Sequence, residues 1–271
     1  MSKIIITAAV TGAWPKKEQN PHVPMTPQEI AEDVYKCYLA GASIAHLHMR
    51  DDEGNGTMDR VKFEETVNLI RQKCDIVINC TTSGDLNATD ETRQAHLKSL
   101  KPEMASYDCG SMNWMHSGLF INHPKFLEEL GYTMQECNVK PEIEIFDAGM
   151  VYNSLHYLKK GVLKGPLHYQ FVLGAAGGTA ATVENLVYLK SLIPEGSTWS
   201  AFGIGKGHVP IMLTAIAMGG HVRVGLEDNL YYRPGVLATN EQLVSRAANI
   251  IRESGNEVAS SDDAREILGL K

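Results

Sequence analysis

The chain has 271 residues, of which 44% are hydrophobic and 21% charged, a composition typical of a soluble globular protein. Its formal net charge of −7 and the absence of a basic run exclude the general nucleic-acid-binding classes, which present a basic face. The apolar stretches are shorter than a membrane span, no signal peptide is indicated, and the five cysteines form no CxxC pair. We therefore expect a reduced, cytoplasmic protein that binds neither nucleic acid nor membrane.

Short β-branched runs alternate along the chain with longer amphipathic segments. Strands are predicted at 3–9, 43–49, 75–80, 103–108, 142–146, 167–173, 198–203 and 221–226. A helix is predicted after each strand, at 27–40, 60–73, 89–99, 124–130, 150–160, 182–193, 208–219 and 240–253. Thr26 and Pro27 suit the cap and the first position of the first helix. The segment 254–271 holds one more helix, which we expect to pack on the outside.

Eight strand–helix pairs in about 250 residues predict an α/β fold, a (β/α)₈ TIM barrel that forms a single domain over 1–271 with an added C-terminal helix. An open, doubly wound sheet is the alternative, but it usually has fewer strands. Barrel active sites lie at the carboxyl ends of the strands. The longest connection at that end is 10–26, and 50–59, 109–123 and 174–181 are also long, so we expect the chemistry there.

Two histidines, His46 and His48, stand two residues apart at the end of the second predicted strand. Side chains alternate between the two faces of a strand, so residues two apart point to the same side. Both imidazoles can therefore reach one cation inside the barrel mouth. Two packed or surface histidines are the alternative, because His-x-His alone is only moderately specific.

Glu227 and Asp228 directly follow the eighth predicted strand. In a closed barrel, strands 8 and 2 both flank strand 1, which brings these carboxylates beside the histidine pair. Neighbouring side chains face different ways, so one carboxylate can bind a cation while the other stays free. Two histidines and one glutamate leave the fourth position of Zn²⁺ open, as in catalytic zinc sites. The alternative is a helix N-cap pair that interacts favourably with the helix dipole.

Arg223 lies four residues before Glu227 on the same predicted strand and points into the same interior. A buried arginine needs an anionic partner, which Asp228, Glu144 or a substrate carboxylate can supply. A salt bridge within the barrel, without any role in binding, is the alternative interpretation.

Weaker signals follow other strands. Five residues, Thr81, Thr82, Ser83, Ser106 and Asp108, are placed to hydrogen-bond a substrate carboxylate or carbonyl, although each alone is more typical of a cap or turn. The glycine-rich loop with Gly177 and Gly178 leads into a helix, and Lys206 lies in a second such loop. Backbone N–H groups and a lysine in this setting can bind a phosphate of coenzyme A, and plain tight loops are the alternative.

A series of segments, in order along nearly the whole chain, resembles the β-keto acid cleavage enzymes. They include ITAAVTGA at 6–13, HLHMRDDEG at 46–54, KPEMAS at 101–106, PEIEIF at 141–146, LHYQFVLGAAGG at 167–178, FGIGKGH at 202–208 and GGHVRVGLEDN at 219–229. The resemblance implies a zinc-bearing barrel that exchanges a β-keto acid with acetyl-CoA, giving acetoacetate and a new acyl-CoA. It also implies a homo-oligomer, a tetramer.

Residue by residue, the resemblance assigns roles to the candidates above. His46, His48 and Glu227 match the zinc ligands, Asp228 the general base, Arg223 the arginine paired with it, and Glu144 a supporting carboxylate. Thr81 or Thr82 stands where the family has a serine–threonine pair, and Ser106 replaces a threonine.

One position departs from the pattern. Members that act on an amino-keto acid have a glutamate after TGA, where it pairs with the substrate's ammonium group, and this chain has Trp14. An indole offers at most a cation–π contact of about 0.5–2 kcal/mol. We therefore expect Trp14 to contact a β-keto acid with an uncharged or mainly apolar tail.

Two other classes compete with this interpretation. Metal-dependent hydrolases of the amidohydrolase type are barrels with His-x-His and a carboxylate on strand 8, but they have the pair on strand 1 and further histidines after strands 5 and 6. Here the pair is on strand 2, and only His168 lies near strand 6. A ligand-binding barrel with a structural metal is the non-enzymatic alternative, against which the open zinc position argues.

Overall fold

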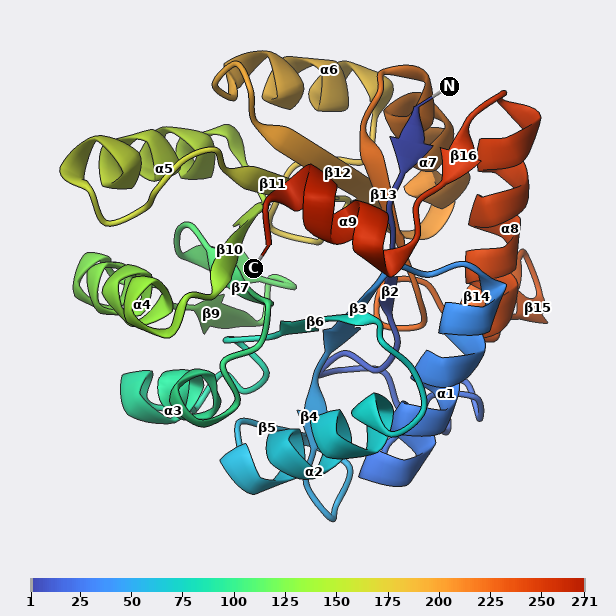
Figure 1. Cartoon of the computed structure of the whole chain (residues 1–271), viewed down its shortest axis with the longest axis horizontal. Coiled ribbons are helices and arrows are strands. Elements are labelled where there is room, and N and C mark those ends of the chain that lie inside the picture. Colours follow the sequence, from blue (N-terminus) through green and yellow to red (C-terminus); the bar gives the residue numbers. More distant parts are fainter. Residues whose placement is uncertain (1, 271) are drawn as a thin grey trace.

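The computed structural model describes residues 2–270 and contains the predicted barrel (Figure 1). Its parallel strands are β2 (Ile6–Ala9), β3 (Ile44–Leu47), β6 (Val77–Cys80), β7 (Met104–Asp108), β10 (Lys140–Ile145), β11 (His168–Leu173), β12 (Thr198–Gly203) and β13 (His221–Val224). They close in the order β10-β11-β12-β13-β2-β3-β6-β7. Because β13 and β3 both pair with β2, the open doubly wound alternative is excluded and the predicted flanking of strand 1 is confirmed.

The helices surround the barrel in chain order (Figure 1). They are α1 (Pro27–Ala40), α2 (Arg60–Arg71), α3 (Asp90–Leu100), α4 (Pro124–Cys137), α5 (Ala148–Lys160), α6 (Val183–Leu192), α7 (His208–Ala217) and α8 (Asn240–Glu253). Thr26 caps α1 and Pro27 begins it, as predicted. The predicted end of the fourth helix at 130 is wrong, because α4 continues through Gly131. A side chain at Gly131 would collide with Val162, so this glycine permits close packing and does not end the helix.

The C-terminal helix α9 (Ser261–Leu268) covers the amino-terminal end of the barrel, and the expectation that it packs on the outside is wrong in this respect (Figure 1). Its Ala264 and Leu268 pack in one cluster with Ile5, Ile44 and Val77 of the strands. Those side chains are apolar and need cover from water. The first predicted strand is also divided: β1 (Lys3–Ile4) leaves the barrel to pair with β16 (Glu257–Val258), the strand that leads into α9.

Three short hairpins lie within connections that were predicted only as loops. They are β4 (Met49–Arg50) with β5 (Gly56–Thr57), β8 (Met112–Trp114) with β9 (Gly118–Phe120), and β14 (Tyr231–Arg233) with β15 (Val236–Leu237). The 3₁₀ helix η1 (Gly205–Gly207) precedes α7. These elements follow β3, β7, β13 and β12, so all belong to connections at the carboxyl ends of barrel strands. Within 2–270, no helix is long and apolar enough to cross a membrane.

A buried arginine holds the long connection after β2 in place. Arg50 is 2% exposed and donates from Nε to the Gly12 carbonyl at 2.8 Å and from Nη2 to the Pro15 carbonyl at 2.8 Å. Further bonds reach the carbonyls of Thr11 and Gly54. A guanidinium has five N–H donors in a planar fork, so one side chain can satisfy several buried carbonyls. Arg50 thereby fixes the backbone on both sides of Trp14.

Candidate active site

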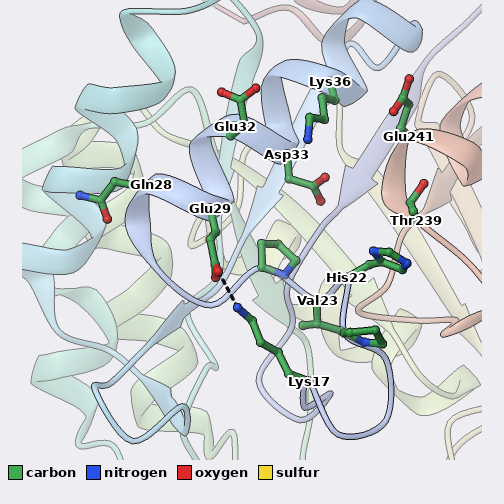
Figure 2. Close-up of a pocket in the computed structure, with 12 residues that line it drawn as sticks. Lys17, His22, Val23, Gln28, Glu29, Glu32, Asp33, Lys36, Thr239 and Glu241 are labelled. Carbon is green, nitrogen blue, oxygen red and sulfur yellow. Dashed lines mark hydrogen bonds and ion pairs between the residues drawn. The ribbon is translucent and has the colours of Figure 1, made fainter.

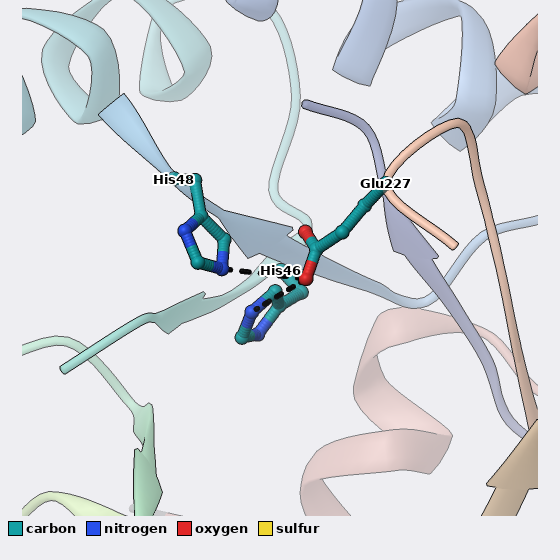
Figure 3. A group of neighbouring side chains, drawn as sticks. All are labelled: His46, His48 and Glu227. Carbon is teal, nitrogen blue, oxygen red and sulfur yellow. Dashed lines mark ion pairs between the residues drawn. The ribbon is translucent and has the colours of Figure 1, made fainter. Parts of the chain in front are cut away.

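Three of the predicted ligand residues meet at the carboxyl end of the barrel (Figure 3). His46 lies on β3, His48 one residue beyond its end, and Glu227 in the connection after β13. The Nε2 atoms of His46 and His48 lie 3.7 and 3.3 Å from the same oxygen, Oε1 of Glu227. One ligand atom from each residue lies within 4.8 Å of the other two. This is the geometry of side chains that converge on one small cation.

Backbone packing carries Glu227 to this position. Gly225 has a φ of 152°, and a side chain there would collide with the backbone of Ala9 on the neighbouring strand. Because glycine lacks a Cβ, the chain can pass close to β2 and turn inward. The Glu227 N–H then bonds to the Ala9 carbonyl at 3.2 Å, which continues the barrel pairing by one step and points the carboxylate toward β3.

The protonation states of His46 and Glu227 suit a cation. Burial lowers the pKa of His46 well below its ordinary value, so its imidazole is neutral and has a bare nitrogen to offer. Burial opposes the charge on Glu227, but His48, Arg223 and His46 hold its pKa well below the usual range. A neutral imidazole and an ionised carboxylate are the forms that bind metals. The donor set therefore fits Zn²⁺, for which two histidines and a glutamate leave one position open.

The excess of acidic over basic side chains around the site also favours a bound cation. Asp108, Glu142, Glu144, Glu227 and Asp228 place five carboxyl groups in or beside the barrel mouth. Among the residues that the structure describes, Arg223 is the only arginine or lysine in ion-pair contact with any of them. Ionised carboxylates are costly to bury unless they are paired or bound to a metal. The excess of acid over base is thus a second feature that favours a cation at this place.

Arg223 connects the ligand cluster to the predicted catalytic carboxylates. It is 3% exposed, and its Nη2 lies 2.5 Å from Glu227 while its Nη1 lies 3.1 Å from Glu144. Its guanidinium also stands 4.6 Å from the ring of Phe202. Burial alone would lower the pKa of Arg223, but the charges of Asp228, Glu227 and Glu144 raise it well above its ordinary value. Two of the predicted partners, Asp228 and Glu144, thus contact this arginine together.

Asp228 is ion-paired with Arg223, one of the partners predicted for this arginine, and is not part of the ligand cluster. Arg223 donates to it twice, from Nε to Oδ2 at 2.9 Å and from Nη2 to Oδ1 at 3.0 Å. The charge of Arg223 acts to lower the pKa of Asp228. Burial outweighs it and raises that pKa to about 6. A carboxylate with a pKa near the working pH is suited to general-base catalysis.

Glu144 and Asp108 form a second carboxyl pair across β10 and β7. The two residues are in register on neighbouring strands, and both side chains are buried and line the cavity. Burial raises the pKa of both groups, and Asp108 raises that of Glu144 further. Two neighbouring buried carboxyl groups disfavour a double negative charge, so this pair favours binding a proton beside Arg223.

The predicted hydroxyl residues bond mainly to one another. Thr82 donates from Oγ1 to the Ser106 carbonyl at 3.0 Å, and its N–H donates to Ser106 Oγ at 3.0 Å. Thr81 Oγ1 lies 3.3 Å from Ser83 Oγ. Of these four, only Ser83 lines the cavity above the cluster. Ser83 is therefore the hydroxyl best placed to meet a substrate, and Thr81, Thr82 and Ser106 support the turn that presents it.

A cavity of about 660 Å³ opens over the cluster. His48, Asp108, Glu144, Arg223, Glu227 and Asp228 form its polar part. Its lining also contains four aromatic side chains, Trp14, Trp114, Phe120 and Phe146. The rings of Trp14 and Trp114 lie 6.2 Å apart, and Trp114 meets both phenylalanines edge to face at 5.9 Å. The cavity thus combines charged and aromatic side chains, and the hairpin β8–β9 supplies two of the four rings.

The three residues predicted to contact coenzyme A do not line this cavity. A side chain at Gly177 would collide with the carbonyl of Asn113 in the β8–β9 hairpin, so this glycine permits a close approach of two loops. The N–H of Gly178 bonds to the Ala175 carbonyl at 2.9 Å and is not offered outward. Lys206 is exposed on η1. The tight-loop alternative therefore accounts for both glycines.

A second, smaller pocket of about 440 Å³ lies outside the barrel, between the start of α1 and that of α8 (Figure 2). Acidic and basic side chains are mixed around it, and Lys17 spans it to pair with Glu29 at 2.5 Å. Asp33 accepts a hydrogen bond from Asn240 at 2.5 Å, which joins α1 to α8. This pocket contains none of the predicted site residues.

The histidines that an amidohydrolase has after strands 5 and 6 are not found at those positions in the described residues. The fifth strand, β10, is followed by Phe146 and Asp147. His168 is the first residue of β11 and therefore lies at the amino end of the barrel, away from the cluster. It bonds there to Thr198 at 2.9 Å.

Comparison with known proteins agrees with this site. A model of the family described as beta-keto acid cleavage enzyme matches residues 3–270. The 3-keto-5-aminohexanoate cleavage enzyme of Fusobacterium nucleatum subsp. nucleatum is 44% identical, with 100% of this chain and 99% of the relative covered. The 3-dehydrocarnitine:acetyl-CoA trimethylamine transferase of Rhizobium meliloti is 33% identical, with 99% and 96% covered.

Among solved structures, the apo structure of ObcA superposes with a TM-score of 0.83 at 20% identity and covers 92% of this chain and 66% of that one. At this identity the superposition shows the shared barrel fold. The family match extends over nearly every described residue, and the relatives are matched along almost their whole length. The chain belongs to the β-keto acid cleavage enzyme family.

Proposed function

We propose that this protein is a zinc-dependent transferase that acts on a β-keto acid and acetyl-CoA. The bond between the ketone carbon and the CH₂ group of the keto acid breaks, and that CH₂ group forms a new bond to the acetyl carbonyl carbon. The products are acetoacetate and a new acyl-CoA, so that every atom of both substrates is retained. The observation that carries the proposal is one cavity lined both by His48 and Glu227 of the three-residue cluster and by the Asp228–Arg223 pair.

Each residue of the cluster and of the ion pair has a role in this reaction. His46, His48 and Glu227 would hold Zn²⁺, which supplies a Lewis acid that polarises the ketone and binds the carboxylate. Asp228 acts as the general base, since it lines the cavity and its pKa is about 6. Arg223 orients Asp228 through two hydrogen bonds and stabilises its charge. Glu144 holds Arg223 from the other side.

The aromatic lining of the cavity supports a proposal about the substrate. Trp14 lines the cavity, is 52% exposed and faces Trp114. A substrate tail that extends away from the charged residues of the cavity would therefore meet indole rings. Neither ring can replace a carboxylate as the partner of an ammonium group. We therefore place an uncharged or mainly apolar tail here, although the Fusobacterium relative is named for an aminated keto acid.

The test is a panel of β-keto acids incubated with acetyl-CoA and the zinc-loaded protein, with acetoacetate measured. Straight-chain 3-keto acids are expected to react faster than 3-keto-5-aminohexanoate. A strong preference for the amine would overturn the proposal for the tail and leave the transferase intact. Turnover without coenzyme A would favour the hydrolase alternative, and no acetoacetate from any keto acid would overturn the transferase itself.

We also propose that the protein is a homo-oligomer, a tetramer. The hairpin β14–β15 supports this, because its side chains Tyr231, Tyr232, Val236 and Leu237 are between 36% and 53% exposed. Exposed apolar patches of this kind are typical of protein–protein contacts. Light scattering from the intact chain would give the oligomer mass, and a monomer at micromolar concentration would contradict the proposal.

A further inference from the structure

His46 presents its two ring nitrogens to two different carboxylates. Its Nε2 faces Glu227 in the ligand cluster, at 3.7 Å from Oε1. Its Nδ1 faces the opposite way, at 3.7 Å from Oε2 of Glu142. Glu142 lies on β10, which is separated from β3 by β6 and β7, so its side chain reaches His46 through the barrel interior. No role in the proposed reaction has so far been given to this glutamate.

Asn79 holds Glu142 in this position. It lies on β6 in register with His46 on β3, so the two residues are neighbours across the sheet. Its Nδ2 donates to Glu142 Oε2 at 2.7 Å. Asn79 and Glu142 are both 0% exposed, so water does not stabilise either group. The two residues form a small polar layer directly beneath the ligand cluster.

This layer has more hydrogen-bonding capacity than the described residues use. His46 Nδ1, Asn79 Oδ1 and Glu142 Oε1 are all buried without a hydrogen-bond partner. Glu142 has no lysine or arginine within ion-pair distance among residues 2–270. Buried polar atoms are normally paired, and a group left unpaired in a native structure calls for an explanation. His46 is the one basic side chain that Glu142 approaches.

Metal binding supplies that explanation. A neutral imidazole has one N–H, and a nitrogen that binds a cation must be bare. If Nε2 of His46 binds the cation, the proton must be on Nδ1, which then needs an acceptor. Metal-binding histidines almost always donate this N–H to a carboxylate, a backbone carbonyl or water. Glu142 Oε2 is the nearest carboxylate oxygen, and a shift of less than about 1 Å brings the pair to hydrogen-bond distance.

We propose that Glu142, positioned by Asn79, accepts the hydrogen bond from His46 Nδ1 and so fixes the tautomer and ring orientation that bind the metal. Glu142 is a positioning residue, because it acts on the cation through His46. The inference rests on the metal site of the proposed function and not on the reaction catalysed there. His48 has no such carboxylate partner. Among the described residues, its only carboxylate contact is through Nε2, and its Nδ1 faces the backbone at Gly84, where a Cβ would lie 3.4 Å away.

Glu142→Gln, which keeps the size and removes the charge, tests the proposal. The affinity for Zn²⁺ is measured by competition with a chelator, without keto acid or coenzyme A. We expect Glu142→Gln to weaken binding by about 10- to 100-fold, the usual effect of losing such a partner. Gln170→Met is the matched control, because Gln170 is equally buried in the barrel and bonds to Ser200, not to the ligand residues. It should leave Zn²⁺ affinity within about threefold of wild type, far less than the loss of an outer partner costs.

The melting temperature of the metal-free protein separates positioning from structural support. Glu142→Gln removes a buried charge that no lysine or arginine pairs with, and it keeps an oxygen for Asn79, so that temperature should stay unchanged or rise. A Zn²⁺ affinity within twofold of wild type for Glu142→Gln would overturn the proposal. It would also be overturned if Glu142→Gln and Gln170→Met lost Zn²⁺ affinity and metal-free stability to the same extent. Should Glu142→Gln not fold, Asn79→Ala gives the second test. It keeps Glu142 but frees it, and should weaken Zn²⁺ binding by a smaller factor.

The cluster of His46, Glu142 and Glu144 offers a competing arrangement in which Glu142 itself binds the cation. Co²⁺ substitution distinguishes the two, because the visible spectrum of Co²⁺ reports its direct ligands. The proposal predicts the wild-type spectrum for Glu142→Gln once Co²⁺ is saturating, and a changed spectrum would overturn it. A wild-type protein that binds no divalent metal would overturn both this inference and the metal site. A normal Zn²⁺ site without keto acid cleavage would overturn only the proposed function.

Discussion

Arg223 donates two hydrogen bonds to the Asp228 carboxylate, at 2.9 and 3.0 Å, from the strand that precedes it. This fork-to-fork geometry fixes the carboxylate in orientation as well as in charge. Burial raises the pKa of Asp228 while Arg223 opposes the rise, which leaves it at about 6. Asp228 is thus a base held in a fixed orientation, and the pair lines the same cavity as the ligand residues His48 and Glu227.

Asp228→Asn is predicted to lower kcat by about 10²- to 10⁴-fold, the usual contribution of a general base. Asparagine keeps the shape and one acceptor oxygen for Arg223, which also keeps its ion pairs with Glu144 and Glu227, so zinc affinity should change little. Steady-state rates of acetoacetate formation test this. Asp85→Asn is the control, because Asp85 caps the turn at Asn87 and does not line the cavity. A kcat within tenfold of wild type for Asp228→Asn would remove this residue from the base role.

Removal of zinc is predicted to abolish turnover and lower the melting temperature, because a ligand that binds only the folded state stabilises it. At a free metal concentration of 100 times Kd this amounts to about 2.7 kcal/mol. His48→Ala should lose both the metal and the metal-dependent stabilisation. His168→Gln, altered at the other end of the barrel, should keep both. The comparison uses thermal melts with and without a chelator, and equal melts for the metal-loaded and metal-free wild type would contradict the prediction.

Arg50→Lys is predicted to lower the free energy of unfolding by about 1–3 kcal/mol, because buried carbonyls lose their donor. Lysine keeps the charge but cannot reach Gly12, Pro15 and Gly54 together. The connection that carries Trp14 should then become sensitive to limited proteolysis. Lys17→Met breaks an exposed ion pair in the same connection and should change stability by less than about 1 kcal/mol. Denaturant unfolding and protease digestion measure the two effects, and equal stability for both variants would argue against the bracing role of Arg50.

Trp14→Glu is predicted to shift the substrate preference toward keto acids with a cationic tail. The carboxylate would lie at the rim of the cavity, where it can pair with an ammonium group. An increase of about tenfold in kcat/KM for the cationic acid relative to a neutral one corresponds to 1.4 kcal/mol, a modest ion pair. Trp14→Phe keeps an aromatic rim and should retain the wild-type preference. Unchanged ratios in Trp14→Glu would show that the tail does not reach this position.

Acid is predicted to destabilise the fold through buried neutral histidines. Burial lowers the pKa of His208 and of His221 from 6.5 to about 4. Since the unfolded chain binds these protons at pH 6.5 and the folded chain only near pH 4, stability is fully present above pH 6.5 and falls between these values. Each histidine contributes up to about 1.4 kcal/mol per pH unit. Urea unfolding at pH 7.5 and pH 5 tests this, and equal stability at both values would contradict it.

The barrel was predictable from the sequence because its strands are β-branched runs of regular spacing, and closure follows from their number. The meeting of His46, His48 and Glu227 was predictable for the same reason, since β13 and β3 both flank β2. The hairpin that carries Trp114 was not, because strands of three residues show too little periodicity to separate from a loop.

The orientation of side chains in turns was the other feature that could not be predicted from the sequence. The sequence places Thr81, Thr82 and Ser83 together after β6, but only the folded turn shows that Ser83 faces the cavity. Glu142 and Glu144 both follow from the alternation in β10, yet they contact different partners, His46 and Arg223, because the barrel interior is layered. Such assignments depend on contacts between strands far apart in the chain, which no local pattern contains.

The most direct measurement of the proposed reaction follows the acetyl group of acetyl-CoA labelled with ¹³C in both acetyl carbons. The zinc-loaded protein is incubated with this compound and an unlabelled straight-chain 3-keto acid. We predict that the label appears in acetoacetate and that the new acyl-CoA is unlabelled, because the acetyl carbonyl forms the new carbon–carbon bond. Label found only in acetate, or no acyl-CoA derived from the keto acid, would contradict the transferase.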